Sequence, residues 1–272
     1  MPKELSKNAS ELLTNIRDKG PLVWNFSNFV SMDIAANALL SIGASPAMAH
    51  AKEEAKDFCQ ICKAINGALT INIGTFDPYW QECALEAAKH ANENNVPWVL
   101  DPVGAGASGF RNKNVEELIK FKPTILRGNG SEIMAVAGLS GGGKGVDSTS
   151  TSNEALDAAI SIANQNKIIV AITGVTDYVT DGNDTYAIES GHEMMTKVTA
   201  TGCALSCLIG AAIAVGENKL LSTASIIGIY GLAGEMASKV SKGPGSLRMN
   251  LLDKLYNIST DEIISNVKIK NV

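Results

Sequence analysis

The chain has 272 residues, of which 45% are hydrophobic, 19% are charged and 5% are aromatic. This composition is typical of a globular protein with an aliphatic core, and it leaves little room for disorder. The 23 basic and 28 acidic residues give a net charge of −5, and no block of Lys or Arg offers the electrostatic footprint of a general nucleic-acid-binding protein.

Short apolar runs alternate with helical patterns along most of the chain. Most of the runs are continuously apolar, as in strands that are buried on both faces of a parallel sheet. The predicted strands are Leu22–Phe26, Ala68–Ile73, Val96–Leu100, Thr124–Leu126 and Lys167–Ile172. The helical patterns between them are Ser31–Ile42, Asp77–Asn94 and Asn153–Asn164. This alternation predicts a layered α/β fold.

The pattern changes at Asp177–Ser190, where two alternating runs flank a turn-rich tetrad. Such a pattern predicts a hairpin, so we expect the sheet to end in an antiparallel addition. The helices predicted after the hairpin are Ala204–Val215, Ser222–Ser241, Leu247–Tyr256 and Ser259–Val267. No internal repeat and no linker interrupts the chain, so we expect residues 1–272 to form a single domain.

The sequence also indicates where the protein works. The first twenty residues are polar and mixed in charge, without the apolar core of a signal peptide. The longest apolar stretch, Cys203–Val215, is too short to span a bilayer. We therefore expect a cytoplasmic protein that does not contact membranes, and its five cysteines are expected to be free thiols.

A Thr/Gly-rich turn, Thr199–Cys203, precedes one of the predicted apolar helices. The first turn of a helix presents free backbone N–H groups at its positive dipole end, so Gly202 lies in a candidate anion site for a phosphate group. A cysteine in this position, here Cys203, is expected to have a depressed pKa. The alternative interpretation is a Thr-capped helix with a small buried cysteine.

Two further polar clusters follow predicted parallel strands, where ligands of α/β sheets gather. In the first, Arg127 can clamp phosphate oxygens, and Glu132, three residues after Asn129, can hold a hydrated Mg²⁺. A simple capped helix start explains this cluster equally well. In the second, Asp101 precedes Pro102 and two glycines, and it is the other candidate carboxylate for Mg²⁺, although such a pair is often only a turn.

Two motif-like segments are rejected. The segment Gly138–Gly145 nearly matches a phosphate-binding P-loop, but it lacks the final hydroxyl residue and follows a helical pattern instead of a strand. It is better interpreted as a helix end that leads into a flexible loop. The pair Cys59 and Cys62 has no second pair nearby, so it is interpreted as two buried helix cysteines.

The motifs together, in their order and spacing from about residue 12 to about residue 250, resemble the hydroxyethylthiazole kinase family of thiamine biosynthesis. The segments that carry the resemblance are Asn28–Asn37, Gly43–Met48, Asp101–Ala105, Arg127–Glu132, Lys144–Ser148, Thr173–Gly174 and Lys197–Cys203. The resemblance implies a ribokinase-like, three-layer α/β/α fold with a central, mostly parallel sheet. It also implies transfer of a phosphoryl group from ATP, with Mg²⁺, to the hydroxyl group of 4-methyl-5-(2-hydroxyethyl)thiazole.

The resemblance further implies a homotrimer with active sites between the subunits, and it assigns roles to single residues. Met48 is expected to lie against the thiazole, while Arg127 and Thr173 are expected to contact ATP. Ala200 is expected to touch the substrate through its backbone. Many relatives have Gly at this position, and the contact survives the change to Ala if φ stays negative. Cys203 stands where related sugar kinases carry an Asp base, so it either accepts the alcohol proton or only shapes the pocket.

Gly74 and Asn25 stand at or near the ends of predicted strands and are expected to line the thiazole pocket. Either position is equally compatible with a plain turn or packing role. The competing functions are a kinase of the same fold for a pyrimidine or pyridoxal, and an ATP-dependent dehydratase that repairs hydrated nicotinamide cofactors. A non-catalytic thiazole-binding protein is a further alternative. Gly43–Met48 and Cys203 argue against the other kinases, and the Asn129–Glu132 cluster argues against a mere binder.

Overall fold

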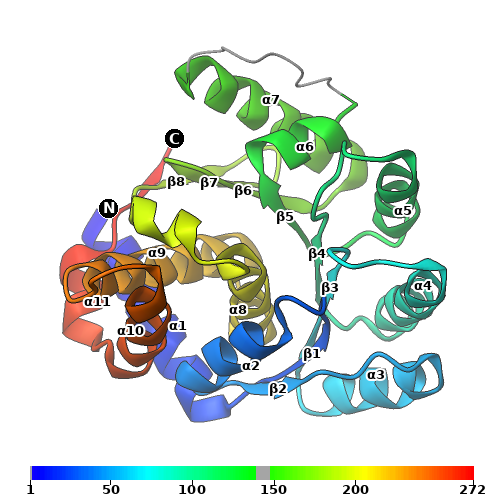
Figure 1. The fold of residues 1–272 in the computed structure, drawn as a ribbon, viewed down its shortest axis with the longest axis horizontal. Coiled ribbons are helices and arrows are strands. Elements are labelled where there is room, and N and C mark those ends of the chain that lie inside the picture. The colour runs from blue at the N-terminus through cyan, green and yellow to red at the C-terminus, as the bar shows by residue number, and fades with distance from the viewer. Residues whose placement is uncertain (1, 139–147) are drawn as a thin grey trace.

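The structure is a computed structural model that describes residues 2–138 and 148–272. Within these ranges nine strands form one sheet in the order β2-β1-β3-β4-β5-β6-β7-β8-β9 (Figure 1). The strands are β1 (Leu22–Phe26), β2 (Ser45–Ala47), β3 (Ala68–Asn72), β4 (Trp98–Asp101), β5 (Ile125–Asn129), β6 (Ile169–Thr173), β7 (Asp177–Thr180), β8 (Thr185–Ile188) and β9 (Ile269–Asn271).

Strands β1 to β6 pair in parallel, so their carboxyl ends lie along one edge of the sheet. Strands β7 and β8 continue the sheet as an antiparallel hairpin, which confirms the prediction for Asp177–Ser190. The last strand, β9, extends this antiparallel part, with Ile269 opposite Ile188. The sequence analysis did not predict β9, because three residues carry no periodicity.

Helices cover both faces of the sheet (Figure 1), which confirms the expected mostly parallel three-layer α/β/α fold. One core joins the sheet to α1, α2, α8, α9, α10 and α11, and a second core joins its other face to α3 through α7. The helices are α1 (Pro2–Lys19), α2 (Met32–Ser41), α3 (Ala55–Ala64), α4 (Pro78–Asn94), α5 (Gly109–Ile119), α6 (Gly130–Val136), α7 (Ser148–Asn166), α8 (Thr201–Val215), α9 (Lys219–Ser238), α10 (Pro244–Asn257) and α11 (Thr260–Asn266).

Helix α8 packs directly on the sheet, and this position matters for the site. A Cβ on Gly210 would lie 2.8 Å from Thr70 Cγ2 and 2.9 Å from Val23 Cγ1. Only a residue without a side chain lets α8 approach β1 and β3 this closely. The contact holds the first turn of α8 at the carboxyl edge of the parallel strands. The helix begins at Thr201, three residues before the predicted start.

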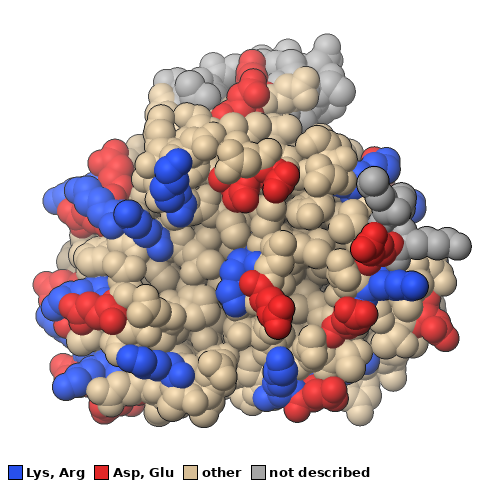
Figure 2. All heavy atoms as spheres, turned by 180° about the vertical axis from the view of Figure 1, so that it is seen from behind, with Lys and Arg blue, Asp and Glu red and all other residues tan. Residues whose placement is uncertain are grey.

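Helix α9 is the one helix in the described part of the chain that is long and apolar enough to cross a membrane. Its most apolar window is 83% buried inside the protein, as in a core helix. The surface seen from behind carries interspersed basic and acidic side chains (Figure 2), in keeping with the balanced composition.

Candidate active site

Four of the residues singled out from the sequence lie together at the carboxyl edge of the sheet. Arg127 of β5 donates a hydrogen bond from Nη2 to Thr173 Oγ1 at the end of β6, at 2.6 Å. Its Nη1 lies 3.7 Å from Oδ2 of Asp101, the last residue of β4. A Cβ on Gly202 would lie 2.8 Å from the same Nη1. Three strands and the first turn of α8 therefore converge on one guanidinium group.

The first turn of α8 offers unpaired backbone donors. The first hydrogen bond within the helix runs from Ala204 N–H to Ala200 O, at 2.9 Å, and the side chain of Ala200 supplies no cap. The N–H groups of Thr201, Gly202 and Cys203 are therefore among the donors that a helix cannot satisfy internally. Together with the positive end of the helix dipole they form a candidate anion site, and the binding of a phosphate group by Gly202 stays a prediction.

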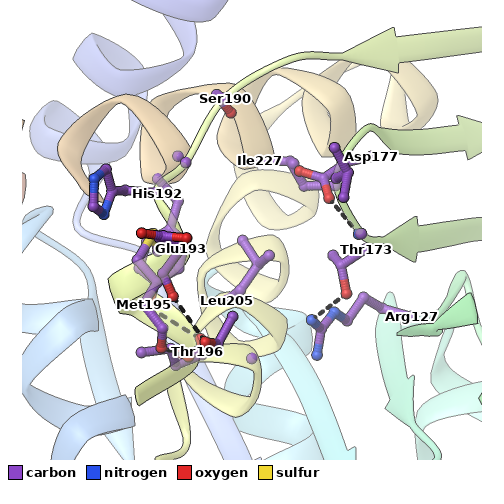
Figure 3. Close-up of a pocket in the computed structure, with 17 residues that line it drawn as sticks. Arg127, Thr173, Asp177, Ser190, His192, Glu193, Met195, Thr196, Leu205 and Ile227 are labelled. Carbon is purple, nitrogen blue, oxygen red and sulfur yellow. Dashed lines mark hydrogen bonds between the residues drawn. The ribbon is translucent and has the colours of Figure 1, made fainter. Parts of the chain in front are cut away.

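A cavity of about 640 Å³ opens beside this turn. In Figure 3, Arg127, Thr173 and Asp177 lie on one side of the cavity, and His192 and Glu193 lie on the opposite side. The segment that carries His192 and Glu193 packs on α9 at glycines that leave no room for a Cβ, Gly231 and Gly234. The cavity has the size of a site for a cofactor or nucleotide, typically about 300–1,000 Å³.

Asp177 is a cavity residue that the sequence analysis did not identify. Its Oδ1 accepts a hydrogen bond from Gly174 N–H at 2.9 Å. Burial raises its pKa to about 6, against the lowering effect of this bond and of the Arg127 charge. The sequence showed only a hairpin strand here. The available signal was a carboxylate four residues after Thr173, where the chain turns back along the sheet.

Asp101 is the most buried carboxyl group of the site, with 1% of its surface exposed. Its Oδ2 accepts hydrogen bonds from Asn72 Nδ2 at 2.8 Å and from Ser206 Oγ at 2.7 Å. Its Oδ1 is buried and has no hydrogen-bond partner. Burial raises the pKa of Asp101 to about 6, although the Arg127 charge acts in the opposite direction. A buried oxygen without a partner is a candidate ligand atom for a bound cation.

Cys203 lies on the other side of the same turn, at the end of a chain of side-chain amides. Asn28 Nδ2 lies 3.5 Å from Cys203 Sγ and donates to Asn72 Oδ1 at 2.7 Å. Asn72 in turn donates to Asp101. The expectation of a depressed pKa for Cys203 is wrong, because burial, followed by the Asp101 charge, raises the pKa of this thiol. The other four cysteines are fully buried.

Glu132 and Asn129 form a capping box at the N-terminus of α6. The Oε2 of Glu132 accepts from Asn129 N–H at 2.9 Å, and Asn129 Oδ1 accepts from Glu132 N–H at 3.0 Å. The Oε1 of Glu132 accepts from Gly104 N–H at 2.9 Å. The helix-capping alternative therefore describes Glu132 correctly, although each oxygen keeps a lone pair. Among the described residues, no group of three His, Cys, Asp or Glu side chains is arranged to hold a metal ion.

The structure separates the residues expected on the thiazole side. Gly74 N–H donates to Asn72 Oδ1 at 2.9 Å, so Gly74 adjoins the amide chain. Met48 is half-buried and packs against the core on the α8 side of the sheet. Asn25 is fully buried, donating to Val23 O at 2.6 Å and accepting from Thr70 Oγ1 at 2.6 Å. Its polar atoms are satisfied inside the sheet, which corresponds to the packing alternative.

Ala200 differs from the expectation attached to it. Its φ is +62°, in the left-handed region, whereas the sequence analysis required a negative φ for a backbone contact. The chain must turn sharply between Val198 and α8, and this residue takes the turn. A side chain in this region costs about 1–2 kcal/mol, a strain that glycine would avoid. The rejected P-loop segment lies outside the described residues, except for Gly138 at the end of α6.

Comparisons with known proteins agree on one family. The sequence model of the hydroxyethylthiazole kinase family matches residues 13–261. A hydroxyethylthiazole kinase of Rhizobium rhizogenes is 46% identical over 259 residues, covering 95% of both chains. That of Arabidopsis thaliana is 43% identical over 259 residues, covering 94% of this chain and 92% of its own.

Solved structures give the same result. A hydroxyethylthiazole kinase protein from Pyrococcus horikoshii OT3 superposes with a TM-score of 0.89 at 40% identity, covering 97% of this chain and 98% of its own. The pyridoxal kinase of Staphylococcus aureus, in complex with AMP-PCP and pyridoxal, superposes with a TM-score of 0.60 at 17% identity. That match covers 93% of this chain and 98% of the kinase. At this identity it shows a shared fold and nothing further.

Proposed function

Because this chain belongs to the hydroxyethylthiazole kinase family, we propose that it transfers the γ-phosphoryl group of ATP to the hydroxyl group of 4-methyl-5-(2-hydroxyethyl)thiazole, in the synthesis or salvage of thiamine. One observation carries the proposal at the level of chemistry. The uncapped first turn of α8 lines a nucleotide-sized cavity with Thr201 and Gly202, and its next residue, Cys203, is half-buried outside that lining. An anion site between a donor and an acceptor is what phosphoryl transfer requires.

On the donor side, Arg127, Thr173 and Gly202 bind ATP in this proposal. The guanidinium group of Arg127 carries the charge that the phosphate oxygens need, and its Nε is buried without a protein partner. The hydrogen bond to Thr173 orients the group toward α8. The N–H of Gly202 would stabilise negative charge on the migrating phosphoryl group by donating a hydrogen bond. In the transition state this charge is spread over the equatorial oxygens of the group.

On the acceptor side, Cys203 lies nearest to the reacting hydroxyl group in this proposal, with Met48 against the thiazole and the backbone of Ala200 and Gly74 beside it. The contact of Ala200 is kept because its φ of +62° is one that a glycine adopts freely, so the backbone takes the course that a glycine would give it. The raised pKa of Cys203 keeps its thiol neutral, so it orients the hydroxyl group and is not a strong base. The loose transition state makes a strong base less necessary than in acyl transfer. Asn25 supports this side from below, through its bond with Thr70.

Mg²⁺ is proposed to arrive with the nucleotide. The unpaired Oδ1 of Asp101 and the remaining lone pairs of Glu132 fit an ion that uses one or two carboxylates and completes its shell with phosphate oxygens and water. When bound, the ion would neutralise charge on the phosphates.

The enzyme is proposed to act in the cytoplasm as a homotrimer with active sites between subunits. Phe29 and Val30 directly follow Asn28 of the acceptor side, yet they are 67% and 58% exposed. A neighbouring subunit that covers them would close this side of the site. Light scattering in solution tests the assembly: a mass three times that of the chain is expected, and a stable monomer would contradict it.

The activity is tested by ADP release from ATP with three acceptors in parallel: the thiazole alcohol, hydroxymethylpyrimidine and pyridoxal. We expect release with the thiazole alcohol and little above background with the other two. A reaction without acceptor measures background hydrolysis. ADP release that depends on pyridoxal or the pyrimidine, but not on the thiazole, would replace the proposal with the corresponding alternative kinase.

A further inference from the structure

Arg111 occupies an unfavourable position for a cation. It lies in the first turn of α5, where its backbone N–H is capped by Ser108 Oγ at 3.3 Å. The positive end of the helix dipole disfavours a basic residue in this turn. No carboxylate within the described ranges lies within ion-pair distance of Arg111 to compensate. The residue must therefore be held by other contacts.

Three backbone carbonyl groups surround the Arg111 guanidinium group. Its Nη1 donates to Ile73 O at 2.7 Å and to Val103 O at 2.6 Å, and its Nη2 donates to Gly74 O at 2.7 Å. Its side chain lies along the backbone of Gly104, where φ is +73° and a Cβ would come within 3.3 Å of Arg111 Cδ. One planar group thus joins the loop after β3 to the loop after β4.

The loop after β3 leads to the acceptor side. Gly74, whose carbonyl accepts from Arg111, donates its N–H to Asn72 Oδ1 at 2.9 Å. The same oxygen accepts from Asn28, whose amide reaches Cys203. A shift of Gly74 would therefore move the amide chain that ends at the thiol.

The loop after β4 leads to the carboxylate side. It begins directly after Asp101, and its Gly104 N–H donates to Glu132 Oε1 at 2.9 Å. Val103, bonded to Arg111, lies between these two points. Strands β3 and β4 already pair up to Asn72 and Asp101, and Ile73 N–H donates to Asp101 O at 3.2 Å. Arg111 adds a link beyond this pairing, because it joins the two loops that follow the strands.

We propose that Arg111 is a positioning residue that sets the separation between the acceptor side and the Asp101–Glu132 side of the active site. The inference rests on the proposed function for its catalytic consequence, but the mechanical link itself does not. A lysine keeps the charge but lacks the planar fork that reaches carbonyl groups on two loops, so Arg111→Lys tests the geometry and not the charge.

The kinetic test compares Arg111→Lys, Arg111→Ala and the control Lys113→Met, a residue of the same helix with a 71% exposed side chain. We expect kcat for the thiazole alcohol to fall about 10- to 100-fold in both Arg111 variants, because small displacements of reacting groups cost this much. Guanidinium ion at low millimolar concentration should restore part of kcat in Arg111→Ala, and Lys113→Met should match the wild type. Unchanged kcat in Arg111→Lys would overturn the proposal.

Hydrogen–deuterium exchange tests the link without substrate. In Arg111→Lys, the amides of residues 72–76 and 103–107 should exchange faster together, while Lys113→Met leaves both unchanged. Faster exchange confined to the first turn of α5 would overturn the proposal. If the wild type does not phosphorylate the thiazole, the proposed function is wrong, and the exchange result alone then decides the role of Arg111.

Discussion

The guanidinium group of Arg127 fills the space that a side chain at Gly202 would need, since a Cβ there would lie 2.8 Å from Arg127 Nη1. Arg127→Ala is therefore expected to raise the KM for ATP and to lower kcat by about 10²–10³, the usual cost of one lost transition-state donor. Gly202→Ala should have the same direction of effect, because it displaces the guanidinium group. Steady-state kinetics with ATP varied measures both.

The control for the glycine variant is Gly109→Ala, where a Cβ would meet no atom within 4 Å. Its kinetics should match those of the wild type. If Arg127→Ala leaves both kinetic constants unchanged, Arg127 does not belong to the nucleotide site.

Cys203 should be dispensable for measurable turnover. Because burial raises the pKa of its thiol, the residue is protonated at neutral pH and supplies little base catalysis. Cys203→Ala should lose less than the roughly 10²–10⁴-fold that a general base contributes. Cys203→Asp should retain or raise turnover, since a carboxylate can accept the proton. Cys59→Ala, in α3 on the opposite face of the sheet, is the matched control. If Cys203→Ala loses all turnover while ATP and thiazole binding stay intact, the thiol is required for the reaction, and the claim that it only orients the hydroxyl group is wrong.

The pH dependence should have opposite signs for stability and activity. Burial raises the pKa of Asp101 from 3.8 to about 6, so the folded protein binds this proton more tightly than the unfolded chain does. Its contribution to the free energy of unfolding is present below pH 3.8 and is lost as the pH rises toward about 6. Activity should fall below about pH 6, because protonation removes the charge proposed to hold Mg²⁺.

Two variants separate the carboxyl groups. Urea unfolding of Asp101→Asn should lack the Asp101 part of this pH dependence. Asp177 has a similarly raised pKa, yet Asp177→Asn should keep the acid limb of kcat/KM. If the acid limb of kcat/KM disappears in Asp177→Asn, the group that titrates is Asp177 and not Asp101, and the assignment made here is wrong.

Ala200→Gly should stabilise the protein. Ala200 has a φ of +62°, so glycine relieves strain and should raise the free energy of unfolding by about 1 kcal/mol, after allowance for the more flexible unfolded chain. Ala36→Gly, within α2, is the control and should lower it by about 1 kcal/mol. Both are measured by urea unfolding. A destabilised Ala200→Gly would show that the alanine side chain makes a contact that outweighs its backbone strain.

The sequence predicted those helices and strands whose buried residues form a clear local pattern of apolar residues. The strand Leu22–Phe26 has its predicted bounds because all but its first residue are buried. Helix α1 was not predicted, although Ala9, Leu12, Leu13 and Ile16 have helical spacing and are buried. The apolar face of this helix is narrow, and most residues of the segment are polar. The segment was therefore not recognised as a helix.

The positions of Asp101 and Arg127 near the carboxyl edge of the sheet were predictable from the sequence, although β5 runs to Asn129, three residues beyond its predicted end at Leu126. Their roles in binding stay predictions. Asp177 and Arg111 were missed because their roles depend on contacts between segments far apart in the sequence, such as the bond from Arg111 to Ile73. Asn25 was placed in the pocket because the pattern does not reveal which face of the strand it occupies. Its bond to Thr70, its partner on β3, satisfies the side chain on the face of the sheet that α8 covers.

The most direct test of this account is a crystal structure with a non-hydrolysable ATP analogue and the thiazole alcohol bound together. The account predicts the γ-phosphate within hydrogen-bond distance of Gly202 N–H and Arg127, with the thiazole hydroxyl group between that phosphate and Cys203. A triphosphate bound elsewhere, with the first turn of α8 covered by protein, would contradict it.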